Sequence, residues 1–360
     1  MPLRNVLFAA CLAQVACAPA IAAEPPGAAA MVQGIIEGYV APAYTTFALE
    51  SGELSDAVGD LCTKPSDRRL AAARAAFADT ADAWSRIELI RFGPVTEENR
   101  LERILYWPDR RSTGLKQVQA ILANEEMSAS NPETLAVKSV AVQGLGALEF
   151  VLFGTGADKL AKLAGFRCVY AKAISGNVET IAQSIDAAWQ AGEGAAGLWA
   201  SPGPDNPLYR DGAEALGEAM DVMVHGLELV RDVRINGFLG KDTAGDKPRQ
   251  ALFWRSGGTI ASLRGNLASI ETLLEAADIA AHLPEDRRWI DRSARFELAN
   301  AGRALAGLDG LPIEDILADP ELRAKLDYVR IVSSSLSDVI GRQLSGEFGL
   351  TIGFSSLDGD

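Results

Sequence analysis

The sequence is poor in the residues that mark several special classes of protein. It has 4 Cys, 16 Pro and 34 Gly among 360 residues, too few for a disulfide-dense mini-protein or a collagen-like chain. Hydrophobic residues make up 48%, which excludes a chain that stays disordered for want of apolar side chains. A chain of this length can bury a large core, which is usually divided between two domains.

Basic residues are also scarce. The chain has 34 Lys and Arg against 48 Asp and Glu, which gives a net charge of -14. The longest basic runs are the pairs Arg68-Arg69, Arg110-Arg111 and Arg287-Arg288. Such a surface repels phosphate backbones and anionic lipid, so nucleic acid is excluded as a partner.

Residues 1–22 have the three parts of a secretory signal peptide. Arg4 precedes an apolar run, and the small residues of Ala20-Ile21-Ala22 follow it. We therefore expect export, with cleavage after this triplet and a mature chain that begins at Ala23. The apolar run is shorter than the roughly 20 residues that span a bilayer, which disfavours a retained anchor. Lipid attachment at Cys11 is the second alternative, disfavoured because little apolar sequence precedes it.

Cysteine usage follows from this leader. Cleavage removes Cys11 and Cys17 and leaves Cys62 and Cys168 in an oxidising compartment. We expect these two residues to form a disulfide, and two free buried thiols are the alternative. The bond would close a long loop, for which the chain-entropy model gives roughly 4 to 5 kcal/mol of stability.

The fold class is predicted to be all-α. Long stretches have helical periodicity, are rich in Ala, Leu, Arg and Glu, and contain few β-branched runs. Helices are expected over Ile35–Leu54 with an interruption at Pro42, Asp67–Arg91, Val95–Leu105, Leu115–Asn124, Glu133–Phe153, Phe166–Ala191, Ala213–Val233, Pro248–Ala277, Glu285–Leu308, and Ile313–Leu344 with an interruption at Pro320. Glycine and proline crowd residues 192–212, which predicts a linker between an N-terminal helix bundle (23–191) and a C-terminal one (213–360).

Glu149 is the only charged residue between Ser139 and Ala157. Leu145 and Phe153 lie four positions to either side, so the carboxylate shares a helix face with large apolar side chains. An ionised carboxylate buried there needs an Arg partner, a metal ion or a raised pKa. Glu149 is therefore a candidate site residue, and a purely structural ion pair is an equally open alternative.

The same helix resembles the signature region of the imelysin-like family of exported bacterial proteins. The matching features are Gly144 to Gly154, Trp84, Arg91-Phe92-Gly93-Pro94, Arg100, Trp107-Pro108-Asp109, the flanking Cys62 and Cys168, and Phe253-Trp254-Arg255-Ser256-Gly257. The resemblance covers essentially the whole mature chain. It implies a periplasmic protein of two packed helix bundles with a site in the groove between them, in a family that has been classed with peptidases.

One departure from the family pattern concerns metal binding. The family's Gly-x-His-x-x-Glu places a His and a Glu on one helix face, where both can ligate one metal ion. Here the glycine is Gly144 and the acid is Glu149, but Gly146 replaces the His. A divalent metal or iron thus remains a conceivable cofactor with an incomplete site. His225 and His282 match no motif position and are interpreted as surface or packing residues.

The other candidate ligand-binding residues come from the matching motifs. They are Arg91, Arg100, Trp107, Asp109, Arg255 and Ser256, all at or beside expected helix ends. Arginine grips carboxylates or phosphates and tryptophan offers a flat apolar wall, so together they could hold a small anionic or aromatic ligand. The alternative is that they only form caps, turns and ion pairs.

The leading functional hypothesis is an exported, non-catalytic binding protein that serves uptake of iron or an iron-containing compound with a cell-envelope partner. The iron link follows from the resemblance alone. A metallopeptidase whose lost His is replaced by a distant residue is the second hypothesis. An interaction protein in which Glu149 is only structural is the third.

Overall fold

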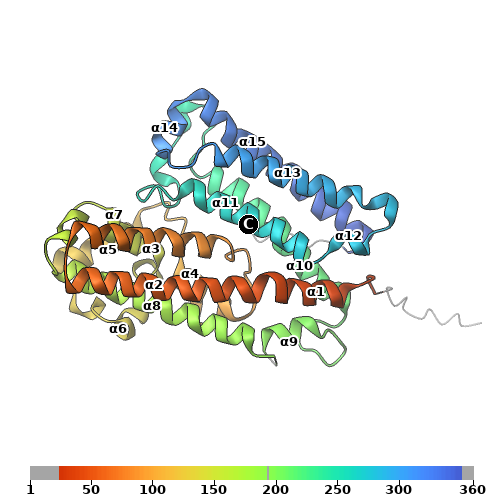
Figure 1. The fold of residues 1–360 in the computed structure, drawn as a ribbon, viewed down its shortest axis with the longest axis horizontal. Coiled ribbons are helices and arrows are strands. Elements are labelled where there is room, and N and C mark those ends of the chain that lie inside the picture. Colours follow the sequence, from red (N-terminus) through yellow and green to blue (C-terminus); the bar gives the residue numbers. More distant parts are fainter. Residues whose placement is uncertain (1–23, 193, 351–360) are drawn as a thin grey trace, which may run out of the picture.

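The computed structural model describes residues 24–192 and 194–350. These residues form helices and connecting loops without a β-strand, so the predicted all-α class is confirmed (Figure 1). The expected signal peptide, residues 1–22, lies outside the described residues. No helix within the described ranges is both long and apolar enough to cross a bilayer.

The first half of the chain forms a bundle around three long helices. Its helices are α1 (Ala28–Ile35), α2 (Ala41–Thr63), α3 (Asp67–Ser85), α4 (Arg100–Ile104), α5 (Thr113–Asn124), α6 (Pro132–Ala136), α7 (Leu145–Phe153) and α8 (Phe166–Gln190). Helix α2 packs against both α3 and α8, and the short α7 packs against α8 and α3. The amphipathic α3 begins where expected, because the Ser66 hydroxyl accepts a hydrogen bond from the backbone N–H of Arg69.

The second half forms a second bundle, drawn above the first in Figure 1. Helix α9 (Ala195–Ala200) still packs against α8 and α1 of the first bundle. The helices of the second bundle are α10 (Gly212–Glu228), α11 (Thr259–Ala276), α12 (Ile279–His282), α13 (Trp289–Ala306), α14 (Ile313–Ala318), α15 (Pro320–Asp338) and α16 (Ser345–Glu347). Helix α11 packs on α13, α13 on α15, and α15 on α10. The segment expected to be a linker, 192–212, contains α9, and the proposed division of the chain there stays a prediction.

Both expected proline interruptions are present. A π-helical turn, Ile36–Val40, joins α1 to α2, and Pro42, which has no N–H to donate to this turn, is the second residue of α2. Pro320 is the first residue of α15. The Asp319 side chain caps that helix by accepting hydrogen bonds from the first free N–H groups.

Two expected helices are shorter than predicted, because long-range contacts use their backbone. The segment Glu133–Phe153 is divided into α6 and α7: at Gly144 the chain lies so close to α4 that a Cβ would collide with backbone carbonyl oxygens of that helix. The helix expected from Pro248 begins only at Thr259. Preceding backbone N–H groups are instead donated to the Glu149 side chain.

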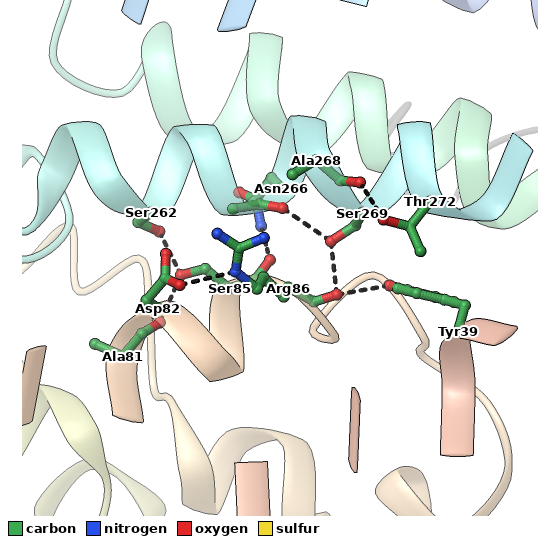
Figure 2. A network of polar contacts seen from close by, with 11 residues as sticks. Tyr39, Ala81, Asp82, Ser85, Arg86, Ser262, Asn266, Ala268, Ser269 and Thr272 are labelled. Carbon is green, nitrogen blue, oxygen red and sulfur yellow. Dashed lines mark hydrogen bonds and ion pairs between the residues drawn. The ribbon is translucent and has the colours of Figure 1, made fainter. Parts of the chain in front are cut away.

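Helix α3 ends at Ser85 and not at Arg91, because α11 side chains take over its free carbonyl groups (Figure 2). Asn266 Nδ2 donates to the Ser85 carbonyl at 2.7 Å, and Ser269 Oγ donates to the Arg86 carbonyl at 2.6 Å. Tyr39 Oη donates to the same Arg86 carbonyl at 2.8 Å. These polar contacts fix the first bundle on the second.

A disulfide ties two helices of the first bundle. Cys62, near the end of α2, is bonded to Cys168, in the first turn of α8, with an S–S length of 2.02 Å. The predicted pairing is confirmed.

Candidate functional site

The carboxylate of Glu149 is buried and holds the loop that precedes α11. The residue is 4% exposed, and its Oε1 accepts three hydrogen bonds, each 3.0 Å long. The donors are the backbone N–H groups of Arg255 and Ser256 and the Ser256 hydroxyl. Burial raises the pKa of Glu149, and these hydrogen bonds together with the Arg255 charge act in the opposite direction.

The second carboxylate oxygen has a looser environment. The nearest cationic atom to Glu149 Oε2 is Arg255 Nη1, at 3.9 Å. The Arg255 guanidinium lies over the ring of Trp254, 4.4 Å from its centroid, and 5.5 Å from that of Phe150. Burial lowers the pKa of Arg255, and the Glu149 charge counteracts this. The pair is therefore a weak ion pair held mainly by backbone donors and ring contacts.

A pocket of about 180 Å³ opens beside this pair. The loop after α4 and helix α7 form one side of it, and the segment that precedes α11 forms the other, so both halves of the chain contribute. The aromatic and charged side chains of its lining include Trp107, Arg110, Glu149, Arg249, Trp254 and Arg255. A site of this kind combines flat apolar walls with a few charged groups, as small-molecule sites do.

Trp107 and Asp109 line the pocket as well as serving the fold. Asp109 accepts the backbone N–H of Thr113 at 2.7 Å and that of Leu115 at 3.0 Å, so both of its oxygens cap the start of α5. Trp107 is backed by Arg234, whose guanidinium carbon lies 4.5 Å from the ring centroid. The structure thus brings together Glu149 and four of the other candidates predicted from the sequence, which are Trp107, Asp109, Arg255 and Ser256.

Arg91 and Arg100 do not join this group. Arg91 is exposed and is absent from the pocket lining. The Nη1 of Arg100 donates to the Pro94 carbonyl at 3.0 Å and contacts Glu97 at the same distance. Arg100 therefore stabilises the turn before α4.

Sequence reasoning missed three of the pocket's side chains. Arg110 and Trp254 are direct neighbours of motif residues, which is a signal that could have identified them. Arg249 lies in a short 3-10 turn, Pro248–Gln250, and nothing in the sequence distinguishes it from other exposed arginines.

The residues present do not fit the metal site that the family motif implies. At Gly146 a Cβ would have its nearest neighbour, the Tyr106 carbonyl oxygen, 3.8 Å away, so the position has room but supplies no ligand. Glu149 Oε1 is already saturated with donors. The described residues contain no group of three His, Cys, Asp or Glu side chains that could hold a metal ion. His225 and His282 lie outside the pocket lining.

A buried ion pair lies behind the pocket, between the two halves. Glu88 follows α3, and its Oε2 accepts a hydrogen bond from Arg234, which belongs to the π-helical turn Leu229–Ile235. Both side chains are at most 5% exposed. Asn266 Nδ2 donates to Glu88 Oε1 at 2.8 Å. Since Arg234 also supports Trp107, this pair connects the pocket wall to the interface between the bundles.

The chain belongs to the imelysin family, whose model matches residues 40–338. The structure is similar to that of an imelysin-like protein from Psychrobacter arcticum, with a TM-score of 0.75, 22% identity, and coverage of 91% of this chain and 97% of that one. It is also similar to a putative iron-regulated protein A precursor from Parabacteroides distasonis, with a TM-score of 0.74, 16% identity and the same coverage. No curated protein sequence matches the chain.

Proposed function

We propose that this chain is an exported, non-catalytic binding protein that serves uptake of iron or an iron-containing compound, with its ligand in the pocket beside Glu149. The observation that carries the proposal is the pocket itself, whose walls come from both bundles and are joined by hydrogen bonds from the Arg255 and Ser256 N–H groups to Glu149. Walls fixed in this way lower the cost of ordering side chains on binding.

The link to iron is supported by the family and by one relative. The solved protein from Parabacteroides distasonis carries the description of an iron-regulated protein. Export is supported by the signal-peptide pattern of residues 1–22 and by the disulfide, which is typical of oxidising compartments.

The peptidase alternative finds no supporting arrangement of side chains. A zinc hydrolase uses about three protein ligands and a metal-bound water. Within the described residues no three candidate ligands come together. We therefore base the proposal on binding.

A growth experiment tests the proposal. The gene is deleted in its host, and growth is measured in medium made iron-poor with a chelator, with complementation by wild type, Gly146→Phe or Gly302→Phe. Gly146 lines the pocket and has room for a side chain, so phenylalanine there fills the pocket. Gly302 lies in α13 with nothing within 4 Å of an added Cβ, outside the pocket lining, and serves as the matched control.

We expect the deletion strain to grow poorly only when iron is scarce. Wild type and Gly302→Phe should restore growth, and Gly146→Phe should not, at equal protein levels in the periplasmic fraction. Normal growth of the deletion strain, or full rescue by Gly146→Phe, would refute the proposal.

A further inference from the structure

We propose that the pocket beside Glu149 binds an organic anion and not a bare metal cation. The anion is a planar aromatic molecule that carries a carboxylate or phosphate group. The inference rests on the proposed function only in taking this pocket as the binding site. It specifies the chemistry of the ligand, and it identifies Arg110 and Arg249 as the residues that select this ligand.

The charge of the pocket lining is the first observation that supports an anionic ligand. Three arginines line the pocket, Arg110, Arg249 and Arg255, in a chain whose net charge is -14. Arg110 and Arg249 are exposed, and neither has a carboxylate partner within 4 Å among the residues that the structure describes. Arg249 lies near enough to Arg255 for its charge to lower the Arg255 pKa. Such a concentration of unpaired positive charge attracts anions and repels cations.

The two acids of the lining, Asp109 and Glu149, offset only part of this charge, since three arginines face them. Asp109 uses both oxygens on backbone N–H groups at the start of α5. Glu149 is opposed by Arg255 at 3.9 Å. Two guanidinium groups, those of Arg110 and Arg249, are therefore left without an opposing carboxylate among the lining residues. A guanidinium can bind a carboxylate or phosphate through two parallel hydrogen bonds.

Aromatic walls give the ligand its shape. Trp107 and Trp254 line the pocket from the two halves of the chain, and Phe150 contributes from α7. Guanidinium groups lie over both tryptophan rings, that of Arg234 over Trp107 and those of Arg249 and Arg255 over Trp254. Flat walls of this kind favour a planar molecule, since aromatic rings gain from offset or edge contact.

The replacement of the family's histidine fits the same chemistry. Gly146 supplies no side chain that could join Glu149 in binding a cation, and it leaves open space in the lining. An iron compound that enters this pocket would therefore present its own anionic or aromatic groups to the protein. The bare ion would meet arginines and a carboxylate whose Oε1 is already occupied.

Calorimetric titration of the chain from Ala23 onward, produced with its disulfide, tests the inference. The probes are phenyl phosphate, inorganic phosphate, benzyl alcohol and Zn²⁺. We expect phenyl phosphate to bind at one site and more tightly than inorganic phosphate, which lacks the ring. Benzyl alcohol and Zn²⁺ should neither bind at this site nor displace phenyl phosphate.

Matched arginine variants locate the site. Arg110→Gln and Arg249→Gln should each weaken phenyl phosphate binding about tenfold, the usual effect of losing one charge-assisted contact. Arg111→Gln, at an exposed neighbour outside the lining, should leave the affinity unchanged. Thermal unfolding of each variant checks that the fold is retained.

Three results would overturn the inference: no saturable binding of phenyl phosphate, equal losses in Arg110→Gln and Arg111→Gln, or displacement of phenyl phosphate by Zn²⁺. They are separate from failure of the proposed function. Anion binding without an iron-dependent growth defect would reject only the role in iron uptake, and the defect without anion binding would reject only the ligand chemistry.

Discussion

At the scale of single residues, Glu149 joins the two halves of the chain through hydrogen bonds. Its Oε1 accepts hydrogen bonds from the N–H groups of Arg255 and Ser256, which would otherwise be free donors at the edge of a loop. Burial makes the ionised form costly, and the three donors offset part of this cost. The side chain therefore positions Arg255, whatever the ligand is.

The raised pKa of Glu149 predicts a pH-dependent difference between wild type and Glu149→Gln. When the folded-state pKa lies above the unfolded one, the native state holds the proton more tightly, and the associated stability is complete below the ordinary value of 4.5. It is lost as the pH rises through the folded-state pKa. Glutamine does not titrate and keeps an acceptor oxygen for the loop. The variant should therefore gain stability relative to wild type as the pH rises through this window.

Urea unfolding at a series of pH values measures this difference. The exposed residue Glu133 provides the control, because Glu133→Gln should show no such trend. A difference between Glu149→Gln and wild type that stays constant with pH would show that the burial of Glu149 does not govern its protonation.

At the scale of helices, local signals in the sequence predicted where elements begin, and distant contacts decided where several end. The start of α3 at Asp67 and the interruption at Pro320 were predicted correctly, since their causes lie within a few residues. The end of α3 was not, because its carbonyl partners lie on α11. The periodicity of the sequence gives no information about a hydrogen-bond partner on a distant helix.

The same distinction applies to the candidate site. Glu149 was identified because a lone charge in an apolar helix is unusual, and Arg255 because of its family motif. Their contact joins residues 106 positions apart, which spacing alone cannot predict. Arg249 could be identified as a pocket residue only from the fold, which places it next to Trp254.

Two glycines of the α7 region give an element-scale prediction. A Cβ at Gly144 would collide with carbonyl oxygens of α4, which is backbone and cannot move away cheaply, so Gly144→Ala should lose about 1–3 kcal/mol. At Gly146 the nearest atom would be 3.8 Å away, so Gly146→Ala should keep the stability or raise it by up to about 1 kcal/mol. Urea unfolding of both variants measures the contrast. Equal losses would mean that α4 and α7 do not approach as described.

At the scale of the whole molecule, the two bundles meet through buried polar groups as well as apolar packing. Asn266 bonds to both the Ser85 carbonyl and the Glu88 carboxylate, and Glu88 is paired with Arg234. Burial lowers the pKa of Arg234, and Glu88 opposes this effect. Polar contacts of this kind specify one relative placement of the bundles, which the pocket between them requires.

A double-mutant cycle tests how strongly this pair couples the bundles. Arg234→Met leaves Glu88 buried without its cation, and Glu88→Met leaves the Arg234 charge unopposed, so each should lose about 3–5 kcal/mol of unfolding free energy. Replacing both removes the unpaired charge, so the double variant should lose clearly less than the sum of the two. Urea unfolding provides the values. The exposed pair Arg342 and Asp338 is the control, with coupling close to zero.

The result of this double-mutant cycle also concerns ligand binding in the pocket, because Arg234 lies over Trp107. If the pair holds the wall, Arg234→Met should also weaken phenyl phosphate binding, although Arg234 is absent from the pocket lining. The double variant still lacks the guanidinium behind Trp107 but has no unpaired buried acid, so it should recover stability more fully than affinity. Additive losses in the cycle, together with unchanged affinity, would mean that the bundles are held by apolar packing and that the pocket wall is independent of their interface.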